Sequence, residues 1–83
     1  MWYVYILQCQ NGKLYTGTTN DVERRIKKHR EGKGARYTRI FGVDSLLYKE
    51  EYKTRSEALR REAQIKGLTR KGKLILIKEN GEK

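Results

Sequence analysis

The sequence predicts a small α/β (α+β) domain in which helices pack on a mixed sheet. Two strand-like segments open the chain, and a strong turn signal joins them. Helix-capping residues then precede two further segments, with a third alternating segment between them. The order is ββαxβα followed by a tail, where x is a short helix or a loop. A chain of 83 residues has room for one domain, which we expect to span residues 1–83.

The first two elements form a predicted hairpin. Trp2–Cys9 is apolar or aromatic on both alternating faces, which is typical of a central strand that is covered on both sides. Asn11-Gly12 is a hairpin turn signal. Lys13–Thr19, rich in Thr and Tyr, is the predicted second strand.

A helix follows the hairpin. Asn20-Asp21 offers an N-cap, and the helix should run to about Arg30, before two glycines at 32 and 34. We expect a short helix or loop over Lys33–Gly42, which carries Tyr37. Leu46–Tyr52 alternates and is the predicted third strand.

The remaining third of the chain is predicted to be mainly helical. Thr54 and Glu57 have the spacing of a capping box, and this helix should end at Gly67. Thr69 is positioned to cap a last segment through Ile77. Its run of four aliphatic residues, 74–77, is compatible with either a buried helical turn or a strand.

Charge and composition restrict the partners. Twenty Lys and Arg against ten Asp and Glu give a net charge of +10, which favours a polyanionic partner, either nucleic acid or an anionic membrane surface. No apolar run approaches the length of a membrane span, and the N-terminus lacks a signal-peptide pattern. A single cysteine, Cys9, has no partner for an internal disulfide. We therefore expect a cytoplasmic protein.

The basic residues concentrate outside the predicted strands. Residues 24–39 hold eight Lys and Arg with one acid, and residues 53–73 hold eight with two acids. Neutralisation of phosphates explains this distribution economically. A membrane-binding helix explains it less well, because no predicted helix has a bulky aromatic face.

Two charged residues face inward on the predicted helices. On the first helix the apolar stripe is Val22 and Ile26; Arg25 and His29 lie beside it, whereas Arg24 points to solvent. This pattern fits a site, but it also fits an arginine that extends along the stripe edge and a histidine that closes a core pocket.

The second inward charge is Glu62. With Leu59 at the centre of the buried stripe of the 54–66 helix, Glu62 and Lys66 fall within that stripe. A carboxylate there is costly unless it is paired. Either an ion pair with Lys66 or an arginine, or a role as ligand of a hard metal ion, satisfies this requirement.

Tyrosine is unusually frequent, with six in the chain. Each can pack its ring and leave its hydroxyl in water, and Tyr48 and Tyr52 are the best candidates for that role.

Taken in order, these residues resemble the GIY-YIG nuclease superfamily, and most closely its small single-domain bacterial members of the UPF0213 group. The resemblance rests on Tyr3-Val4-Tyr5, Tyr15-Thr16-Gly17, Arg25 with His29, and a helical Glu62. Ala35-Arg36-Tyr37-Thr38 and the stretch Glu62–Arg70 also resemble that group, and the likeness covers roughly residues 2–77. Tyr3 and Thr16 depart from the glycine and isoleucine of the name motif.

The resemblance implies a three-stranded antiparallel sheet flanked by helices, in the order ββααβα with a C-terminal helical segment. It implies a phosphodiesterase that uses one divalent ion, Mg²⁺ or Mn²⁺, held by Glu62. Arg25 would complement charge on the transition state, Tyr5 or a water that it orders would take the nucleophile's proton, and His29 would assist. Tyr15 would orient water or phosphate. The residues expected to contact nucleic acid, DNA above all, are Lys28, Lys33, Arg36, Tyr37, Lys66 and Arg70.

A shared site for the two motif tyrosines requires a particular hairpin. A two-residue turn would place Tyr15 on the opposite face from Tyr5. A three-residue loop, Gln10–Gly12, with Gly12 as a left-handed bulge, pairs Tyr5 with Gly17 and Tyr15 with Leu7, on one face. We predict this three-residue loop.

Three functions remain open on the sequence alone. The first is an endonuclease, with a role in repair or recombination inferred from the relatives and a transient dimer on the substrate if both strands of a duplex are cut. The second is a nucleic-acid-binding module with little or no cleavage. The third is an accessory domain that docks on an acidic protein. The inward Arg25, His29 and Glu62 favour the first over the third.

Overall fold

The computed structural model describes residues 1–34 and 42–81. Its elements are β1 (Trp2–Cys9), β2 (Leu14–Thr19), α1 (Val22–Arg30), β3 (Val43–Tyr52), α3 (Arg55–Lys66), α4 (Arg70–Leu76) and a π-helical turn, η1 (Ile77–Gly81). The predicted second helix or loop falls largely on residues 35–41, outside the described residues. No helix within the described ranges has the length and apolar character needed to cross a membrane.

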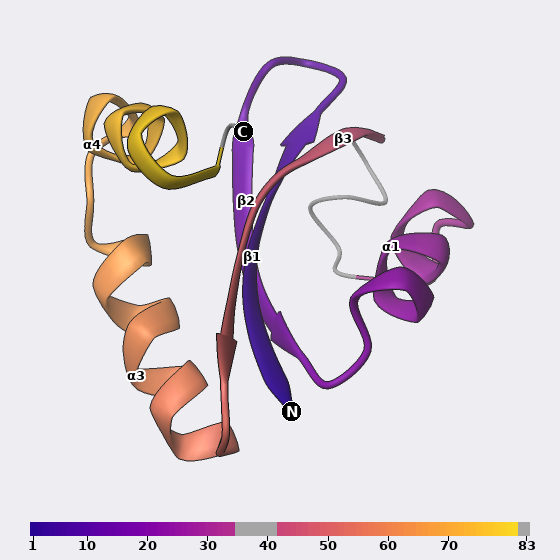
Figure 1. Ribbon diagram of the computed structural model, residues 1–83. Helices are drawn as coiled ribbons and strands as arrows, with labels where there is room; N and C mark the ends of the chain where they lie inside the picture. The colour runs from indigo at the N-terminus through magenta and orange to yellow at the C-terminus, as the bar shows by residue number, and fades with distance from the viewer. Residues whose placement is uncertain (35–41, 82–83) are drawn as a thin grey trace.

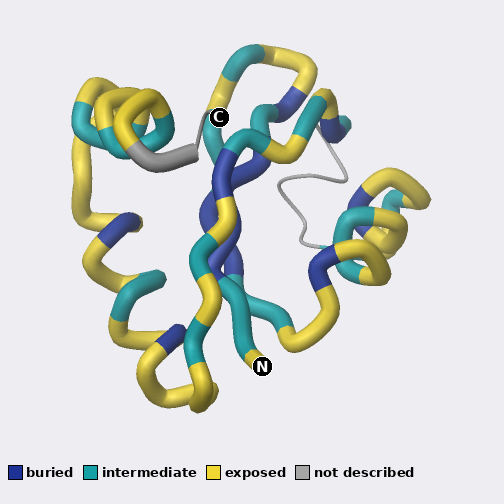
Figure 2. The backbone as a smooth tube through the Cα atoms, viewed as in Figure 1, coloured by how far each residue is buried: buried dark blue, intermediate teal, exposed yellow. Residues whose placement is uncertain are grey.

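The three strands form one antiparallel sheet in the order β2-β1-β3, as the resemblance implied. Helix α1 covers one face of the sheet, and α3 and α4 cover the other (Figure 1). Strand β1 is therefore covered on both sides, and Figure 2 shows its buried residues in the middle of the molecule. The two-faced apolar pattern of Trp2–Cys9 predicted this central position correctly.

Each face of the sheet carries its own apolar cluster. The cluster beneath α3 consists of Val4, Ile6, Tyr48, Ala58 and Ile65. The cluster on the α1 face consists of Tyr5, Leu7 and Val43, with Tyr15 and Ile26 packed against it. Odd-numbered residues of β1 thus face α1, so Tyr5 lies on the α1 side of the sheet.

The hairpin between β1 and β2 has the predicted three-residue loop. Cys9 N donates to Lys13 O at 2.8 Å, and Gly12 N donates to Cys9 O at 2.9 Å. Gly12 has a φ of 85°, which is the left-handed position of the bulge. The register pairs Tyr5 with Gly17 and Leu7 with Tyr15, and so places both motif tyrosines on one face.

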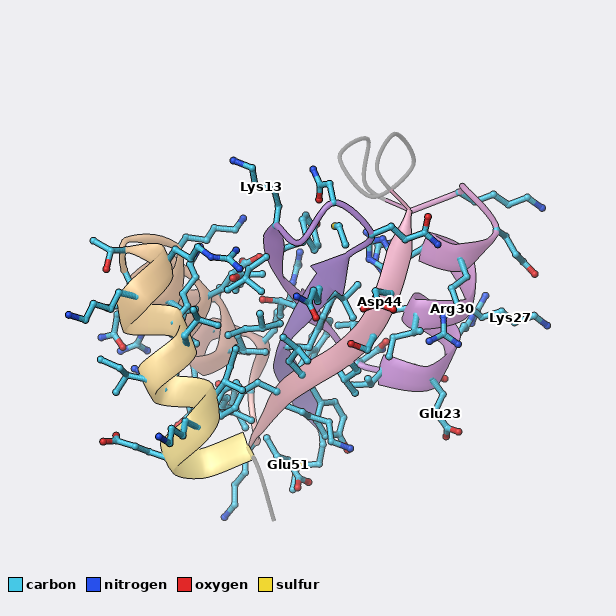
Figure 3. All side chains as sticks on the ribbon, turned by 90° about the horizontal axis from the view of Figure 1, so that it is seen from above. Lys13, Glu23, Lys27, Arg30, Asp44 and Glu51 are labelled. Atoms are coloured by element: carbon cyan, nitrogen blue, oxygen red, sulfur yellow. The ribbon has the colours of Figure 1, made fainter. Side chains whose placement is uncertain are left out.

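The predicted helix caps are confirmed. Asp21 caps α1 by accepting from Arg24 N at 3.1 Å, and the chain leaves the helix at Gly32, whose φ is 79°. Thr54 and Glu57 form the capping box of α3, and Gly67 is its C-cap. In Figure 3 the side chains of Glu23 and Lys27 extend from α1 away from the sheet.

Two element boundaries are refined by the structure. Strand β3 begins at Val43, three residues before the predicted start, and pairs with β1 through register shifts. The aliphatic run 74–77 is helical: Thr69 caps α4 as predicted, by accepting from Gly72 N at 3.0 Å.

The buried face of α3 differs from the prediction. Leu59 is 42% exposed, whereas Ala58 and Ile65 are fully buried. The true stripe adds Arg61 and Glu62, both half-buried, so it lies roughly 100° around the helix from Leu59. The pattern of apolar residues predicted the wrong buried face for α3, because two of the four residues on the true face are charged.

A polar network explains how Arg61 is accommodated. Its guanidinium donates to Glu50 at 2.9 Å (Nε–Oε1) and 3.1 Å (Nη2–Oε2). The hydroxyls of Tyr48 and Tyr52 also donate to Glu50. The expectation that these two hydroxyls remain in water is therefore wrong, because a carboxylate on the same strand face accepts both.

Candidate active site

Tyr5 and Tyr15 approach each other on the α1 face of the sheet. Their ring centroids lie 6.3 Å apart with planes tilted by 45°. They come from adjacent strands, and the three-residue hairpin loop sets the register that brings them together. Tyr5 is 1% exposed, while Tyr15 is half-buried at the edge of the sheet.

Two glycines make room for the side chains of the site. A Cβ atom on Gly17 would lie 2.4 Å from the Tyr5 hydroxyl oxygen, and one on Gly34 would lie 2.3 Å from Nδ1 of His29. Neither approach is sterically tolerable, so both backbone positions require glycine. The sequence marks Gly17 through the Tyr-Thr-Gly motif and its predicted pairing with Tyr5, but it does not reveal the close approach of the Tyr5 ring.

Helix α1 contributes Arg25 and His29, one turn apart. Nε2 of His29 lies 3.0 Å from the Tyr5 hydroxyl, and the His29 ring stands edge-on to that of Tyr15, with centroids 5.3 Å apart. The Arg25 side chain interacts with Tyr5 and, more weakly, with Tyr15, and both interactions raise the pKa of Arg25. Arg24 is exposed on the opposite side, as predicted.

Burial and the neighbouring charges set the protonation states in this cluster. Burial raises the pKa of Tyr5 to about 12; the hydrogen bond from Arg25 opposes this shift without overcoming it, and the Glu62 charge adds to it. Burial, together with the Arg25 charge, lowers the pKa of His29 to about 4. Near pH 7, Tyr5 is therefore a neutral phenol and His29 a neutral imidazole.

Arg25 carries the permanent charge of the cluster. Its hydrogen bond with Tyr5 raises its pKa, so the guanidinium stays protonated. Within residues 1–34 and 42–81, the ion pairs are Glu50–Arg61 and Glu62–Lys66, and neither includes Arg25. A half-buried cation held by phenols rather than by a carboxylate is suited to bind an anion.

Glu62 approaches from α3, on the other side of the sheet. Its side chain is 18% exposed, and Oε2 lies 3.3 Å from the Lys66 ammonium, one turn later. The ion pair anticipated from the sequence is thus present. The negative charge of Glu62 adds to the raised pKa of Tyr5, after the larger effect of burial.

A metal site at Glu62 would rest on a single carboxylate. Among the described residues, no group of three or more His, Cys, Asp or Glu could hold a metal ion. Mg²⁺ often binds through one or two carboxylates and completes its shell with water and substrate phosphate. Glu62, half-buried and already paired with a cationic ammonium, fits such a site, which the substrate would complete.

The predicted nucleic-acid contacts divide into three groups. Lys28 and Lys33 are exposed, and Lys28 lines an open cavity of about 280 Å³ with Arg24 and Arg25. Lys66 and Arg70 already have partners in the protein, since Arg70 donates to the hairpin carbonyl of Gly12 at 2.7 Å. Two further predicted contacts, Arg36 and Tyr37, lie outside the described residues.

Arg24 was missed as a candidate contact. Helix geometry correctly placed it opposite the apolar stripe, but the cavity wraps around the helix start and includes Thr19, Asn20 and Asp21. The adjacent pair Arg24-Arg25 was the sequence signal that could have identified Arg24 as a candidate contact.

The chain is similar to known proteins over most of its length. The family model of the GIY-YIG catalytic domain matches residues 1–75. A UPF0213 protein of Staphylococcus aureus (strain Mu3 / ATCC 700698) is 52% identical over 77 residues, covering 93% of this chain and 94% of the relative.

Two solved structures resemble the fold. The solution NMR structure of the UPF0213 protein BH0048 from Bacillus halodurans is 48% identical with a TM-score of 0.63, covering 98% of this chain and 87% of the other. That of EF2693 from E. faecalis is 43% identical with a TM-score of 0.63, covering 93% and 82%. Sequence motifs, sheet topology and these matches together establish that the chain belongs to the GIY-YIG family.

Proposed function

We propose that this protein is a divalent-metal-dependent endonuclease that hydrolyses phosphodiester bonds of nucleic acid, DNA above all. The observation that carries the proposal is Arg25: a half-buried guanidinium that interacts with Tyr5 and Tyr15 and takes part in no ion pair among the described residues. Its position in a cluster with Tyr5, Tyr15 and His29 suits a phosphate oxygen better than a structural role. Repair or recombination is the process in which we place this activity.

Phosphate binding is assigned to Arg25 and Tyr15. Both side chains are half-buried, and the guanidinium fork can donate two hydrogen bonds to one phosphate. As the attack proceeds, the phosphorus centre gains negative charge, and the fixed Arg25 charge stabilises that state more than the ground state. Tyr15 orients the phosphate or the attacking water through its hydroxyl.

Proton transfer is assigned to the Tyr5–His29 pair. With its pKa raised to about 12, Tyr5 cannot supply a phenolate in the resting protein. We assign it instead to a relay: the attacking water gives a proton to the Tyr5 oxygen, while the Tyr5 proton passes to His29 Nε2, 3.0 Å away. The resulting hydroxide forms the new P–O bond, the bond to the 3′-oxygen breaks, and that oxygen takes a proton from solvent. Negative charge on the transition state would favour the imidazolium that forms.

Glu62 is assigned as the ligand of one Mg²⁺ or Mn²⁺. When bound, the ion would neutralise charge on a phosphate oxygen and on the leaving 3′-oxygen. To bind it, Glu62 must exchange its contact with the Lys66 ammonium, which is 56% exposed and free to turn toward solvent or a phosphate.

Cleavage of labelled single-stranded, duplex and branched DNA in Mg²⁺, Mn²⁺ and EDTA tests the proposal. Arg25→Lys, Glu62→Gln and Tyr5→Phe should each lower cleavage by about a hundredfold or more. Matched controls are Arg30→Lys, on an exposed position of the same helix, and Glu51→Gln, exposed on β3. Cleavage that persists in EDTA or in Glu62→Gln would overturn the metal assignment.

A binding module without cleavage is the second candidate, and the raised pKa of Tyr5 specifically favours it. The basic cavity beside Arg25 needs no proton transfer to hold a phosphate. Salt-dependent binding with no cutting on any substrate, in either metal, would establish this function instead. Nicking of duplex DNA by a monomer, or paired cuts at higher protein concentration, would decide whether a transient dimer forms on the substrate.

A further inference from the structure

A second basic cavity lies on the other side of strand β2 from Arg25. It has a volume of about 280 Å³ and is open to solvent. The residues that line it are Leu14, Tyr15, Thr16, Lys66 and Lys73. Because β2 is an edge strand, this cavity and the one beside Arg25 flank the same sheet edge.

The wall of this cavity contains an unpartnered polar group. Thr16 is 3% exposed, and its hydroxyl has no hydrogen-bond partner among residues 1–34 and 42–81. The Thr18 hydroxyl, two residues along on the same strand face, is also buried and has no partner within these ranges. Buried hydroxyls are nearly always bonded, so Thr16, a residue of the cavity wall, has an unused capacity to form a hydrogen bond with a partner.

The charges of the cavity identify that partner as an anion. Lys66 and Lys73 contribute two ammonium groups, and Lys73 takes no part in the ion pairs of the described residues. Two cations exclude a metal ion, whereas a phosphate accepts hydrogen bonds from ammonium and hydroxyl groups together. The cavity touches the candidate active site twice, through Tyr15 and through the Lys66–Glu62 contact.

We propose that this cavity binds a backbone phosphate of the nucleic acid next to the scissile one. The inference rests on the proposed function and adds a path for the substrate. The strand crosses the exposed edge of β2, with phosphates on the α1 side near Arg24 and Lys28 and on the α3–α4 side near Lys73. Thr16 is a binding residue in this scheme, and its departure from the isoleucine of the name motif supplies the hydroxyl.

Binding of a labelled single-stranded oligonucleotide in EDTA, followed by fluorescence anisotropy over a range of salt concentrations, tests the proposal without cleavage. Lys73→Gln is the main variant, because Lys66 also contacts Glu62. We expect about tenfold weaker binding and a salt slope smaller by about 0.7, the value for one phosphate contact on single-stranded DNA. Lys71→Gln makes the same charge change at an exposed position of α4 outside the cavity, and it should leave both quantities nearly unchanged.

Thr16→Val separates a binding role from a structural one. It removes the hydroxyl at nearly constant shape, so it should raise thermal stability, because an unpartnered buried group disappears. The same variant should bind the oligonucleotide about fivefold more weakly, with an unchanged salt slope. If the Thr16 hydroxyl had only a structural role, its removal could not raise thermal stability and weaken oligonucleotide binding at the same time.

Identical binding and slopes for Lys73→Gln and Lys71→Gln would overturn the subsite, whatever the cleavage assay shows. A weakened Thr16→Val that is also less stable would overturn it too. If the wild-type protein binds DNA through Lys73 but never cuts it, the subsite stands and the nuclease assignment fails.

Discussion

The hydroxyl of Tyr5 lies 3.0 Å from Nε2 of His29, and this buried contact joins the central strand to helix α1. Both side chains are 1% exposed. Ile26 packs against the apolar cluster of this face, and the His29 ring also contacts Tyr15, so further contacts join α1 to the sheet. The same contact therefore supports the fold and sets the geometry of the candidate site.

Tyr5→Phe should reduce both stability and activity. Removing the hydroxyl leaves His29 Nε2 without that partner in a buried position, at a cost of about 1–2 kcal/mol in the free energy of unfolding. Urea denaturation measures this cost. Tyr3→Phe, on the same strand but half-buried, is the matched control and should change the free energy by less than about 0.5 kcal/mol. Equal effects in the two variants would contradict a specific Tyr5–His29 bond.

Stability should fall as pH drops from neutrality toward 4. The pKa of His29 is about 4 in the folded protein and near 6.5 when unfolded, so the unfolded chain binds the extra proton first. The contribution of neutral His29 to the free energy of unfolding is complete above about pH 6.5 and is lost as pH falls toward 4. Its total is on the order of 2–3 kcal/mol. His29 is the one histidine of the chain, so its NMR ring signals report this pKa without mutagenesis. A measured pKa at or above 6.5 would contradict the buried neutral imidazole.

Glu50 should matter more for folding than any single exposed acid. It accepts hydrogen bonds from Arg61, Tyr48 and Tyr52, so Glu50→Ala removes the acceptor of two phenols and leaves the Arg61 guanidinium with Gln64 but without its carboxylate partner. We expect a loss of about 2–4 kcal/mol, measured by thermal and chemical denaturation. Glu51→Ala, on the exposed face of the same strand, should cost little.

The Glu50 network adds a second acid transition. Hydrogen bonds from Arg61 hold the pKa of Glu50 below its ordinary value, despite the opposing effect of burial. Its stabilising contribution is thus present above the usual range for a glutamate and is lost as pH falls through the lowered pKa. In Glu50→Ala, the curve of stability against pH should become flatter in the low-pH range where Glu50 titrates. The loss of stability due to His29, at higher pH, should remain.

Local sequence signals predicted most of the fold. The caps at Asp21, Thr54 and Thr69 and the bulge at Gly12 act through neighbouring backbone atoms, so they can be read from short motifs. The inward face of α3 could not be read this way. That face depends on Glu50 of β3, whose carboxylate pairs with Arg61 of α3. The pattern of apolar residues along α3 carries no information about a partner on another element.

The sequence predicted that side chains of the candidate site lie together on the α1 face of the sheet, but it did not predict their protonation states. Helix geometry placed Arg25 and His29 beside the apolar stripe, and the hairpin register placed Tyr15 with Tyr5. The protonation states depend on three-dimensional burial, which raises the pKa of Tyr5 and lowers that of His29. The unpartnered Thr16 hydroxyl likewise has no signature in the sequence, because being unpartnered is a property of the packed structure.

Gly17→Ala should damage the site through sterics alone. The new Cβ would lie 2.4 Å from the Tyr5 hydroxyl oxygen, so the ring must move away from His29 and Arg25. We expect a loss of about 1–3 kcal/mol in stability and of most DNA cleavage. Gly72→Ala is the matched control: its Cβ would meet Leu68 at an ordinary 3.4 Å within a helix, so alanine there should be neutral or stabilising. Similar damage from both substitutions would contradict a specific clash at Tyr5.

Metal binding should depend on the substrate. Because the site offers Glu62 and no cluster of three or more metal-binding side chains among the described residues, millimolar Mg²⁺ alone should raise Tm by less than about 1 °C. With a DNA oligonucleotide present, Glu62 would hold the ion together with the substrate, so Mn²⁺ should strengthen DNA binding in the wild type and not in Glu62→Gln. Anisotropy titrations with and without Mn²⁺ measure this coupling, and Glu51→Gln controls for the loss of one negative charge. A large rise in Tm with Mg²⁺ alone would mean that the protein provides a preformed site, and then the single-carboxylate assignment is wrong.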